Sequence, residues 1–472
     1  MVRITFIAVL FLITLTCSQK IEAQQIKSKK QNVVSKLVTT AEGKTYIEVD
    51  GKPFLYNSVQ AWLPADGNYE LFMRKTHDVG YNIFTLWFPW RSIEPQKGKM
   101  DWSVLDKVIK QAEKFNMRLD IVWGGSNFCG GLDKRFAPDF ILNDSSFFVK
   151  DENGSVEEVK KYDMGMCHVA NYSNKKLLEI ESTTIRAMMN YLYKRDTSHR
   201  VVIFQIENEP NLMEWSLQDK KVILNYINAL GKVIKTSPYS IVTRVNLASK
   251  NYEPLIDSLE YIDCHGLDIY TEELDVLHST VKFKTKMPHI AENAAYENSS
   301  TLIAEALANG GFYNIYRLDF DKIWNKPGIY GDDWIYLHQT FDIQLFNRAL
   351  YKISVQVAES SAKNMICFNT ATKMPASDYS EIKELNGFKI GFQSLNSWQD
   401  QGVGFVLNYK GDYYLIADNK CTFYFPVDVK AETGSFNDQG KWMATSTKSI
   451  TKVNDGRFEL KYNFYECIRI YK

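Results

Sequence analysis

The stretch Val201–Asn211 reads VVIFQIENEPN, and the interpretation of the whole chain starts from it. As far as Ile206 it is apolar apart from one glutamine and rich in β-branched residues, which is typical of a strand buried in a parallel sheet. Glu207 and Glu209 follow, and Pro210 ends the strand. Two carboxylates there cost free energy unless they are solvated, hydrogen-bonded or functional. In barrels of parallel strands the active site lies at that end, although a polar loop after a core strand would give the same pattern.

Strand-like and helix-like segments alternate on both sides of this stretch. The expected strands are residues 53–58, 83–88, 118–122, 201–206, 240–245, 261–267, 289–292 and 311–316. The expected helices are residues 70–79, 102–115, 175–193, 220–235, 302–308 and 341–361, with a short one near Leu255. This alternation predicts an α/β fold, a (β/α)8 TIM barrel. A doubly wound sheet is disfavoured because residues 57–62 (NSVQAW) lack the glycines of a phosphate-binding turn.

The segments on either side of the barrel have different patterns. Residues 24–43 are rich in lysine, glutamine and serine, which is typical of a linker. After about residue 363, short alternating runs separated by glycine- and aspartate-bearing turns predict an antiparallel β-sandwich. We therefore expect a signal peptide at residues 1–23, a linker at 24–43, a barrel at 44–362 and a C-terminal β-sandwich domain at 363–472.

The N-terminal stretch predicts export. Arg3 precedes an apolar run over residues 4–15, which is too short to span a membrane and fits a secretory signal cleaved after Ala23. Cys17 could instead carry a lipid anchor, although Thr14 stands where a lipobox would prefer leucine. No later run is long enough for a transmembrane segment, so we expect a periplasmic, cell-surface or secreted protein.

Composition and cysteine spacing exclude some classes of partner. The chain has 56 basic and 56 acidic residues, a balance that argues against nucleic acid as a partner. Aromatic residues make up 14% of the chain, which suits sugar stacking and core packing alike. The six cysteines after Cys17 form no Cys-x-x-Cys and there is no His-Glu-x-x-His, so we expect no metal site. Export permits disulfides, but Cys264 lies in a predicted core strand and is expected to be free.

Two carboxylates at separate strand ends are what glycoside hydrolysis requires: one protonates the leaving oxygen, and the other attacks the anomeric carbon or activates water. The first candidate is Glu209, with Glu207 as its rival. The second is Glu292, which directly ends the apolar run of residues 287–293 (MPHIAEN), with Glu297 as its rival. Strands four and seven of a barrel lie nearly opposite, so their ends can hold two carboxyl groups about 5 Å apart, the spacing of a retaining enzyme.

Four blocks carry a resemblance to a known family. Phe204–Pro210 (FQIENEP) resembles the acid/base strand of glycoside hydrolase family 35, the β-galactosidases, within the (β/α)8 retaining glycosidase clan. The other three blocks are residues 90–102, residues 136–140 (FAPDF) and residues 266–270 (GLDIY). The resemblance implies that Glu209 is the proton donor, that Tyr270 hydrogen-bonds the nucleophile, and that no cofactor takes part. The sequence departs from the family after Asn293 and at residues 123–127 (WGGSN), which weakens the inference of galactose specificity.

Further side chains are candidates for substrate binding. Asn208 could donate its amide to a sugar 2-hydroxyl, or simply form a turn. Tyr270 is a candidate through the resemblance, or else a core aromatic. Trp87, Trp90 and Trp123 lie at expected strand ends, where they could form a sugar platform or pack in the barrel.

These observations favour an exported retaining β-glycosidase, most consistent with an exo-acting β-galactosidase on plant or host glycans. Two alternatives stay open: an endo-acting β-glycanase of the same clan, and a non-catalytic glycan-binding protein on a barrel scaffold. The insertion at residues 124–172 could wall off one end of the cleft and favour exo action. In either case the expected partner is an oligo- or polysaccharide, and the sequence leaves the oligomeric state open.

Overall fold

The computed structural model describes residues 32–41, 43–61, 69–127, 129, 131–161, 165–210, 217–248, 257–268, 289–293, 299–316, 343–371, 381–394 and 401–471. The signal peptide expected at residues 1–23, with Cys17, lies outside these residues, as do Tyr270 and Glu297. No helix within the described part of the chain is both long and apolar enough to cross a bilayer.

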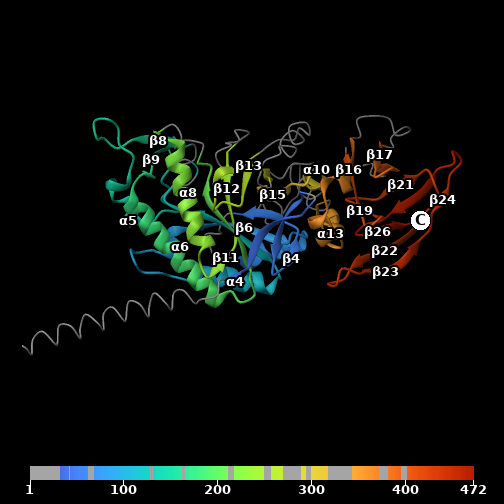
Figure 1. Ribbon diagram of the computed structural model, residues 1–472, viewed down its shortest axis with the longest axis horizontal. Helices are drawn as coiled ribbons and strands as arrows, with labels where there is room; N and C mark the ends of the chain where they lie inside the picture. Colours follow the sequence, from blue (N-terminus) through green and yellow to red (C-terminus); the bar gives the residue numbers. More distant parts are fainter. Residues whose placement is uncertain are drawn as a thin grey trace, which may run out of the picture.

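Eight parallel strands close into a barrel, as predicted (Figure 1). Around the ring they run in the order β10-β12-β13-β14-β15-β5-β6-β7, with β7 returning to β10. Their bounds are β5 Asn57–Ala61, β6 Ile83–Pro89, β7 Arg118–Gly124, β10 Val201–Asn208, β12 Val242–Leu247, β13 Cys264–Asp268, β14 His289–Asn293 and β15 Phe312–Tyr316. Because chain order and spatial order coincide, every strand delivers its carboxyl end to the same mouth of the barrel.

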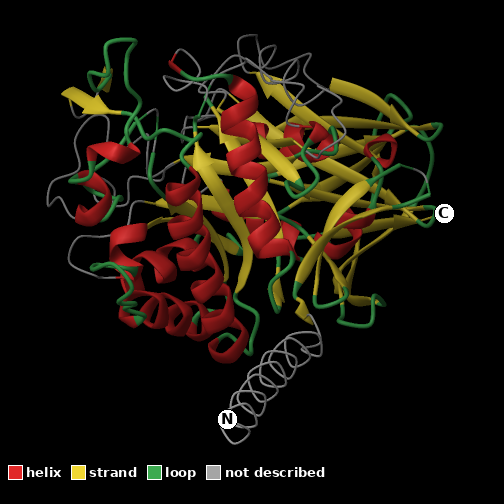
Figure 2. Cartoon of the chain, turned by 60° about the vertical axis from the view of Figure 1, so that its left-hand side comes forward, coloured by secondary structure: helices red, strands yellow, loops and turns green. Residues whose placement is uncertain are grey.

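Helices lie on the outside of the strands, as Figure 2 shows. They are α2 Tyr69–Asp78, α3 Trp90–Ile93, α4 Ser103–Lys114, α6 Lys175–Arg195, α8 Lys220–Lys235, α10 Ser299–Ala308, a helix over residues 343–351, and α13 Ser354–Glu359. Apolar residues three and four apart face the barrel; in α6 they include Leu177, Ile185 and Met188. Between β7 and α6, the insertion contains α5 Asp139–Leu142, η1 Ser145–Phe147, β8 Glu158–Lys161 and β9 Gly165–His168.

The single helix predicted over residues 341–361 is wrong, because a turn at residues 352–353 divides it. The Lys352 carbonyl accepts a hydrogen bond from the backbone N–H of Phe436 at 3.1 Å, and the Lys352 ammonium bonds the Tyr465 carbonyl. Phe436 lies in β22 and Tyr465 in the turn between β25 and β26, so residue 352 contacts the C-terminal sandwich where the helix is divided.

The linker predicted at residues 24–43 is wrong in its described part. β1 (Asn32–Val33) pairs in parallel with β11 (Tyr239–Ser240), and β2 (Ser35–Thr39) forms a three-stranded sheet with β3 (Thr45–Val49) and β4 (Lys52–Phe54). The Ser35 hydroxyl donates to the carbonyl of Val202 in barrel strand β10. The polar side chains of this stretch do not prevent ordering because its backbone pairs and Val34 is buried.

Two antiparallel sheets form the predicted C-terminal sandwich (Figure 1, orange to red). The six-stranded sheet contains β16 Met365–Ala371, β19 Gln401–Tyr409, β20 Asp412–Ala417, β26 Ile468–Tyr471, β22 Lys430–Phe436 and β23 Trp442–Lys448. The five-stranded sheet contains β17 Glu381–Leu385, β18 Phe388–Ser394, β21 Cys421–Phe425, β25 Phe458–Tyr462 and β24 Thr451–Lys452. The rings of Phe368, Phe392 and Phe423 pack between the sheets, with neighbouring centroids 5.5 and 5.3 Å apart. The first sheet also packs on the barrel, where Phe405 meets Phe346 edge-on.

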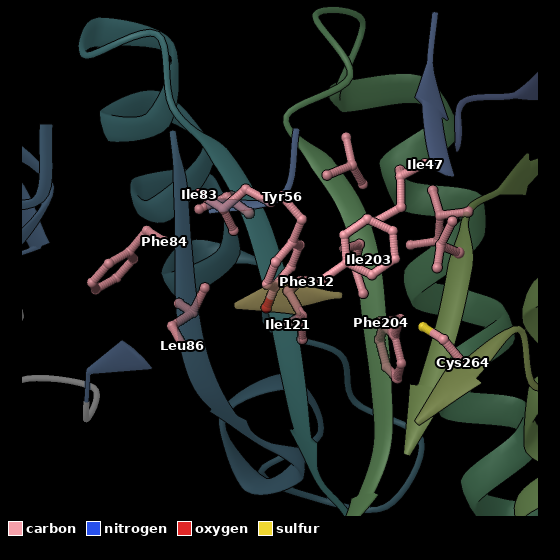
Figure 3. Close-up of a cluster of buried hydrophobic side chains, with 14 of the residues drawn as sticks. Ile47, Tyr56, Ile83, Phe84, Leu86, Ile121, Ile203, Phe204, Cys264 and Phe312 are labelled. Carbon is pink, nitrogen blue, oxygen red and sulfur yellow. The ribbon is translucent and has the colours of Figure 1, made fainter. Parts of the chain in front are cut away.

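The barrel interior combines an apolar lining with a buried charge pair. Figure 3 shows apolar side chains of the barrel wall, among them Ile121 on β7 and Phe204 on β10. Among these strands, Arg244 Nε lies 2.9 Å from Asp120 Oδ2, and the Tyr56 hydroxyl donates to the same oxygen at 2.9 Å. Burial raises the pKa of Asp120, and Arg244 and Tyr56 oppose that rise.

All six cysteines after Cys17 are described, and none of them is in a disulfide with another. The expectation of a free Cys264 is therefore confirmed, and none of the disulfides that export would permit is formed among these six. Burial raises the pKa of Cys264 well above that of an ordinary thiol, so this residue is a core side chain rather than a nucleophile.

Candidate active site

The end of β10 departs from strand geometry at the two glutamates. The pairing register with β12 shifts between Gln205 and Asn208, and Glu207 and Glu209 adopt φ values of 67° and 55°. Non-glycine residues rarely occupy this left-handed region, and such strain clusters at functional sites. The Glu209 N–H donates to the Asn246 carbonyl of β12 at 2.9 Å, which ties the distorted segment to the neighbouring strand.

The two glutamates of β10 have different surroundings. Glu207 accepts hydrogen bonds from the Tyr172 hydroxyl and, at 3.1 Å, from the backbone N–H of Asn208. The Glu209 carboxylate is almost buried, yet within the described residues it has no hydrogen-bond or ion-pair partner. Both oxygens of Glu207 are engaged by these bonds, whereas the Glu209 carboxylate is available for a reaction. The surroundings therefore favour Glu209 over Glu207 as the reacting group.

Asn208 is held from two sides. Gln205 Nε2 donates to its Oδ1 at 2.7 Å, and its Nδ2 lies 3.1 Å from Cys129 Sγ. The backbone N–H of Cys129 also donates to the Asn208 carbonyl at 3.0 Å. Sequence reasoning missed Cys129, because a single cysteine in a long insertion gives no signal of its position.

Glu292 occupies the strand position that was predicted for it. Its backbone in β14 pairs in register with Asp268 of β13 and Asn314 of β15. Both neighbours are buried: Asp268 accepts from Asn246 Nδ2 at 2.8 Å, and Asn314 donates to Gln60 at 3.3 Å. The carboxyl ends of β12, β13, β14 and β15 thus carry polar residues at neighbouring positions in the pairing register. The expected 5 Å separation between the carboxyl groups of Glu209 and Glu292 stays a prediction.

Asp268 was also missed as one of these polar residues. It ends an apolar strand two residues before Tyr270, so the signal that selected Glu292 was present in the sequence. Its bond to Asn246, whose carbonyl receives the Glu209 N–H, links β10 to β13 through β12.

Two of the three tryptophans proposed as a sugar platform are misassigned. Trp90 and Trp123 are 0% and 1% exposed, so no sugar ring can reach their faces. The Trp90 Nε1 donates to Glu94 at 3.0 Å, and the Trp123 Nε1 donates to Glu181 of α6 at 2.8 Å. Both indoles therefore pack between the barrel and its outer helices.

Trp87 lies in a different environment. It packs against Phe136, with ring centroids 5.8 Å apart, and belongs to a small cluster with Val122 and Cys129. Cys129 contacts Asn208, so this cluster borders the end of β10. A role for Trp87 in sugar binding stays a prediction.

Glu181 holds the loop that follows β7. Its carboxylate accepts hydrogen bonds from Trp123, from the Ser126 hydroxyl at 3.1 Å and from the Tyr226 hydroxyl at 2.6 Å. Burial raises the pKa of Glu181, and these three bonds oppose the rise. A Cβ at Gly125 would lie 2.2 Å from Glu181 Oε1, which explains a glycine at this departure from the family pattern.

The described residues contain no group of three or more histidine, cysteine, aspartate or glutamate side chains that could hold a metal ion. His265 is buried on β13, and burial lowers its pKa to about 4, which keeps the ring neutral near pH 7. Neutral histidine can be a ligand, but no such cluster surrounds it among these residues.

Known proteins resemble the chain in the region of this site. The model of the glycoside hydrolase family 42 β-galactosidases matches residues 65–221, the segment from before α2 to beyond β10. Over 143 residues the chain is 25% identical to human β-galactosidase-1-like protein 3. Residues 65–221 are thus similar to β-galactosidases.

The matched segment of this β-galactosidase-like chain includes Glu209 and ends before Glu292. The alignment with the human relative covers 29% of this chain and only 22% of that protein's length. The likeness to β-galactosidases expected from Phe204–Pro210 is thus confirmed, with a matching model numbered 42 rather than 35.

Solved glycosidase structures are more distantly similar. A β-galactosidase from the psychrophilic Marinomonas ef1 matches with a TM-score of 0.47 and 10% identity, covering 65% of this chain and 62% of that one. An endo-1,4-β-mannanase from Rhizomucor miehei matches with a TM-score of 0.43 and 12% identity, covering 66% and 99%.

Proposed function

We propose that this protein is a retaining β-glycosidase with Glu209 as acid/base and Glu292 as nucleophile. The observation that carries the proposal is the pair of glutamates at the carboxyl ends of β10 and β14 in one closed barrel. The hydrogen bonds at the end of β10 engage the carboxylate of Glu207 and leave that of Glu209 available for the reaction.

The reaction proceeds in two displacements. A Glu292 oxygen bonds to the anomeric carbon as that carbon's bond to the leaving oxygen breaks, and Glu209 gives its proton to that oxygen. Water then attacks the anomeric carbon and passes a proton to Glu209, which releases Glu292 and the sugar with its original anomeric configuration.

Asn208 contributes a sugar contact in this proposal. Its Nδ2 faces the Cys129 sulfur, which is a weak hydrogen-bond acceptor. A sugar 2-hydroxyl can replace that acceptor at little cost, and Gln205 keeps the amide oriented through its Oδ1. A hydrogen bond to the 2-hydroxyl strengthens as positive charge develops on the ring.

The finer parts of the proposal concern the sugar, the mode of attack and the export of the protein. The β-galactosidase likeness favours a β-galactoside, and the insertion at residues 124–172 favours exo action, since it follows β7 at the mouth. The N-terminal apolar run favours export, with the lipid anchor at Cys17 as its variant. These parts can fail without affecting the roles of Glu209 and Glu292.

A panel of nitrophenyl β-glycosides tests the function. Glu209→Gln is expected to lower kcat/KM on nitrophenyl substrates by about 10²–10⁴-fold, and Glu292→Gln by at least as much. Glu48→Gln, which alters a surface pair with Lys36 far along the chain from either strand end, is the matched control and should retain activity. Normal turnover in both active-site variants would reject the assignment.

Product analysis separates the remaining alternatives. Single-sugar release from an oligosaccharide ladder supports exo action, and mixed lengths support an endo-acting glycanase. Glycan binding without reducing-end release would support the non-catalytic alternative.

A further inference from the structure

The proposed reaction does not use a phenol–carboxylate contact buried behind the end of β10. Tyr172 is the last residue of the insertion and precedes α6, and its hydroxyl donates to Glu207 Oε2. Both side chains are almost fully buried. Burying a carboxylate is costly, so its contacts require an explanation.

The Glu207 carboxylate joins two parts of the chain. One oxygen receives the Tyr172 hydroxyl, and the other receives the backbone N–H of Asn208 at 3.1 Å. Asn208, which carries that N–H, lies between two residues with positive φ, Glu207 and Glu209. At this point the register shift removes regular pairing with β12, so Glu207 supplies a hydrogen-bond acceptor to the distorted segment.

Tyr172 is itself fixed from several directions. Its ring packs on Tyr226 of α8, with centroids 4.4 Å apart, and Tyr226 donates to Glu181 of α6 at 2.6 Å. The backbone N–H of Tyr172 donates to Gln218 Oε1 at 2.8 Å. The ring that carries this hydroxyl is therefore anchored on α8, and through Tyr226 on α6.

We propose that Glu207 and Tyr172 form a positioning pair that holds the strained end of β10 and thereby aims Asn208 and Glu209 at the substrate. Strain of about 1–3 kcal/mol at each unusual residue persists only where the surroundings enforce it, and this pair provides such enforcement. Glu207 is thus a positioning residue, although its place next to Asn208 and Glu209 in the sequence also made it a candidate for the acid/base. The inference rests on the proposed function.

Two variants test the pair. Glu207→Gln keeps the shape but can place an NH2 group against the Asn208 N–H, and Tyr172→Phe removes the donor while keeping the ring packing. Because displacing a reacting group by about 1 Å can cost about 10²-fold, we expect each variant to lower kcat/KM on nitrophenyl substrates by about 10–100-fold. KM should change much less, and the double variant should lose little more than either single one, since the pair acts as a unit.

Leaving-group dependence distinguishes positioning from general damage. A dinitrophenyl leaving group departs without protonation, so a misplaced Glu209 should slow hydrolysis of a less activated nitrophenyl glycoside, and still more of an alkyl glycoside, far more than that of the dinitrophenyl one. Glu209→Gln should show the same pattern in stronger form. If a variant merely contained less folded protein, its apparent kcat/KM would fall by the same factor for both substrates.

A second tyrosine–carboxylate pair, Tyr191 with Asp106, provides the control. The Tyr191 hydroxyl donates to both Asp106 oxygens at 2.9 Å between α6 and α4, so Tyr191→Phe removes a similar bond without touching the site. It should leave both kcat/KM values within about twofold. Glu207→Gln and Tyr172→Phe enzymes with normal kcat/KM, or with equal losses on both leaving groups, would overturn the positioning role. If the wild-type enzyme and Glu209→Gln have the same kcat/KM on both substrates, the proposed function itself fails.

Discussion

The barrel and the C-terminal sandwich both have buried interiors, but the side chains in the two interiors differ in polarity. Between the two sheets, the side chains that pack are dominated by phenylalanine, leucine and isoleucine. Within the barrel strands, Asp120, Arg244 and Asp268 are buried together with amide side chains. Buried polar groups stabilise a fold less well than apolar packing does, so their concentration in the barrel marks the part of the molecule that carries the chemistry.

The largest expected difference between the two regions concerns the buried ion pair. Arg244→Met leaves the Asp120 carboxylate without its cation, and we expect the free energy of unfolding to fall by about 3–5 kcal/mol. Asp120→Leu combined with Arg244→Met should cost clearly less than the single change, because no charge then remains buried. Denaturant unfolding measures both. A double variant as unstable as Arg244→Met would contradict the comparison.

A smaller effect follows from His265, whose pKa burial lowers from 6.5 to about 4. Above pH 6.5 the ring is neutral in both states. As the pH falls towards 4, the unfolded chain takes up a proton that the folded protein does not, so the unfolding free energy falls. The difference corresponds to about 3 kcal/mol between pH 7.5 and pH 4. His265→Gln should flatten the wild-type dependence by that amount, whereas an unchanged slope would show that the folded ring titrates normally.

The smallest effect tests the sandwich alone. A Cβ at Gly404 would lie 2.6 Å from the ring of Phe392, so Gly404→Ala forces that ring to shift. We expect an unfolding free energy lower by about 1–3 kcal/mol, with kcat/KM per folded molecule unchanged. Calorimetry and the nitrophenyl assay check the two parts. Lower activity in fully folded Gly404→Ala protein would mean that the sandwich contributes to the site.

The barrel could be predicted because each strand is a short apolar run and each helix keeps its periodicity. The direction in which individual side chains point could not be predicted from the sequence. Trp87 pairs in register with Val122, while its neighbour Phe88 pairs with Trp123. When a strand is apolar on both faces, its sequence does not reveal which alternate residues point into the barrel. Trp87 and Trp123 therefore looked equivalent in the sequence.

The sequence pattern favours Glu209 over Glu207 as the proposed acid/base, but it does not reveal what Glu207 contacts. Glu207 differs from Glu209 because of Tyr172, which lies 35 residues earlier at the end of the aperiodic insertion. Cys129 reaches Asn208 from the same insertion. Contacts of this kind depend on tertiary folding of loops, for which local pattern carries no signal.

The roles of Glu209 and Glu292 are tested most directly by trapping the covalent intermediate. A 2-fluoro β-galactoside with a dinitrophenyl leaving group should form the glycosyl-enzyme quickly and release it slowly, because fluorine destabilises the positively charged transition state and the leaving group needs no acid. Peptide mass spectrometry should place the label on Glu292, and Glu209→Gln should still be labelled while Glu292→Gln is not. A label on any other residue, or inactivation-free turnover to a sugar of inverted configuration, would contradict the account.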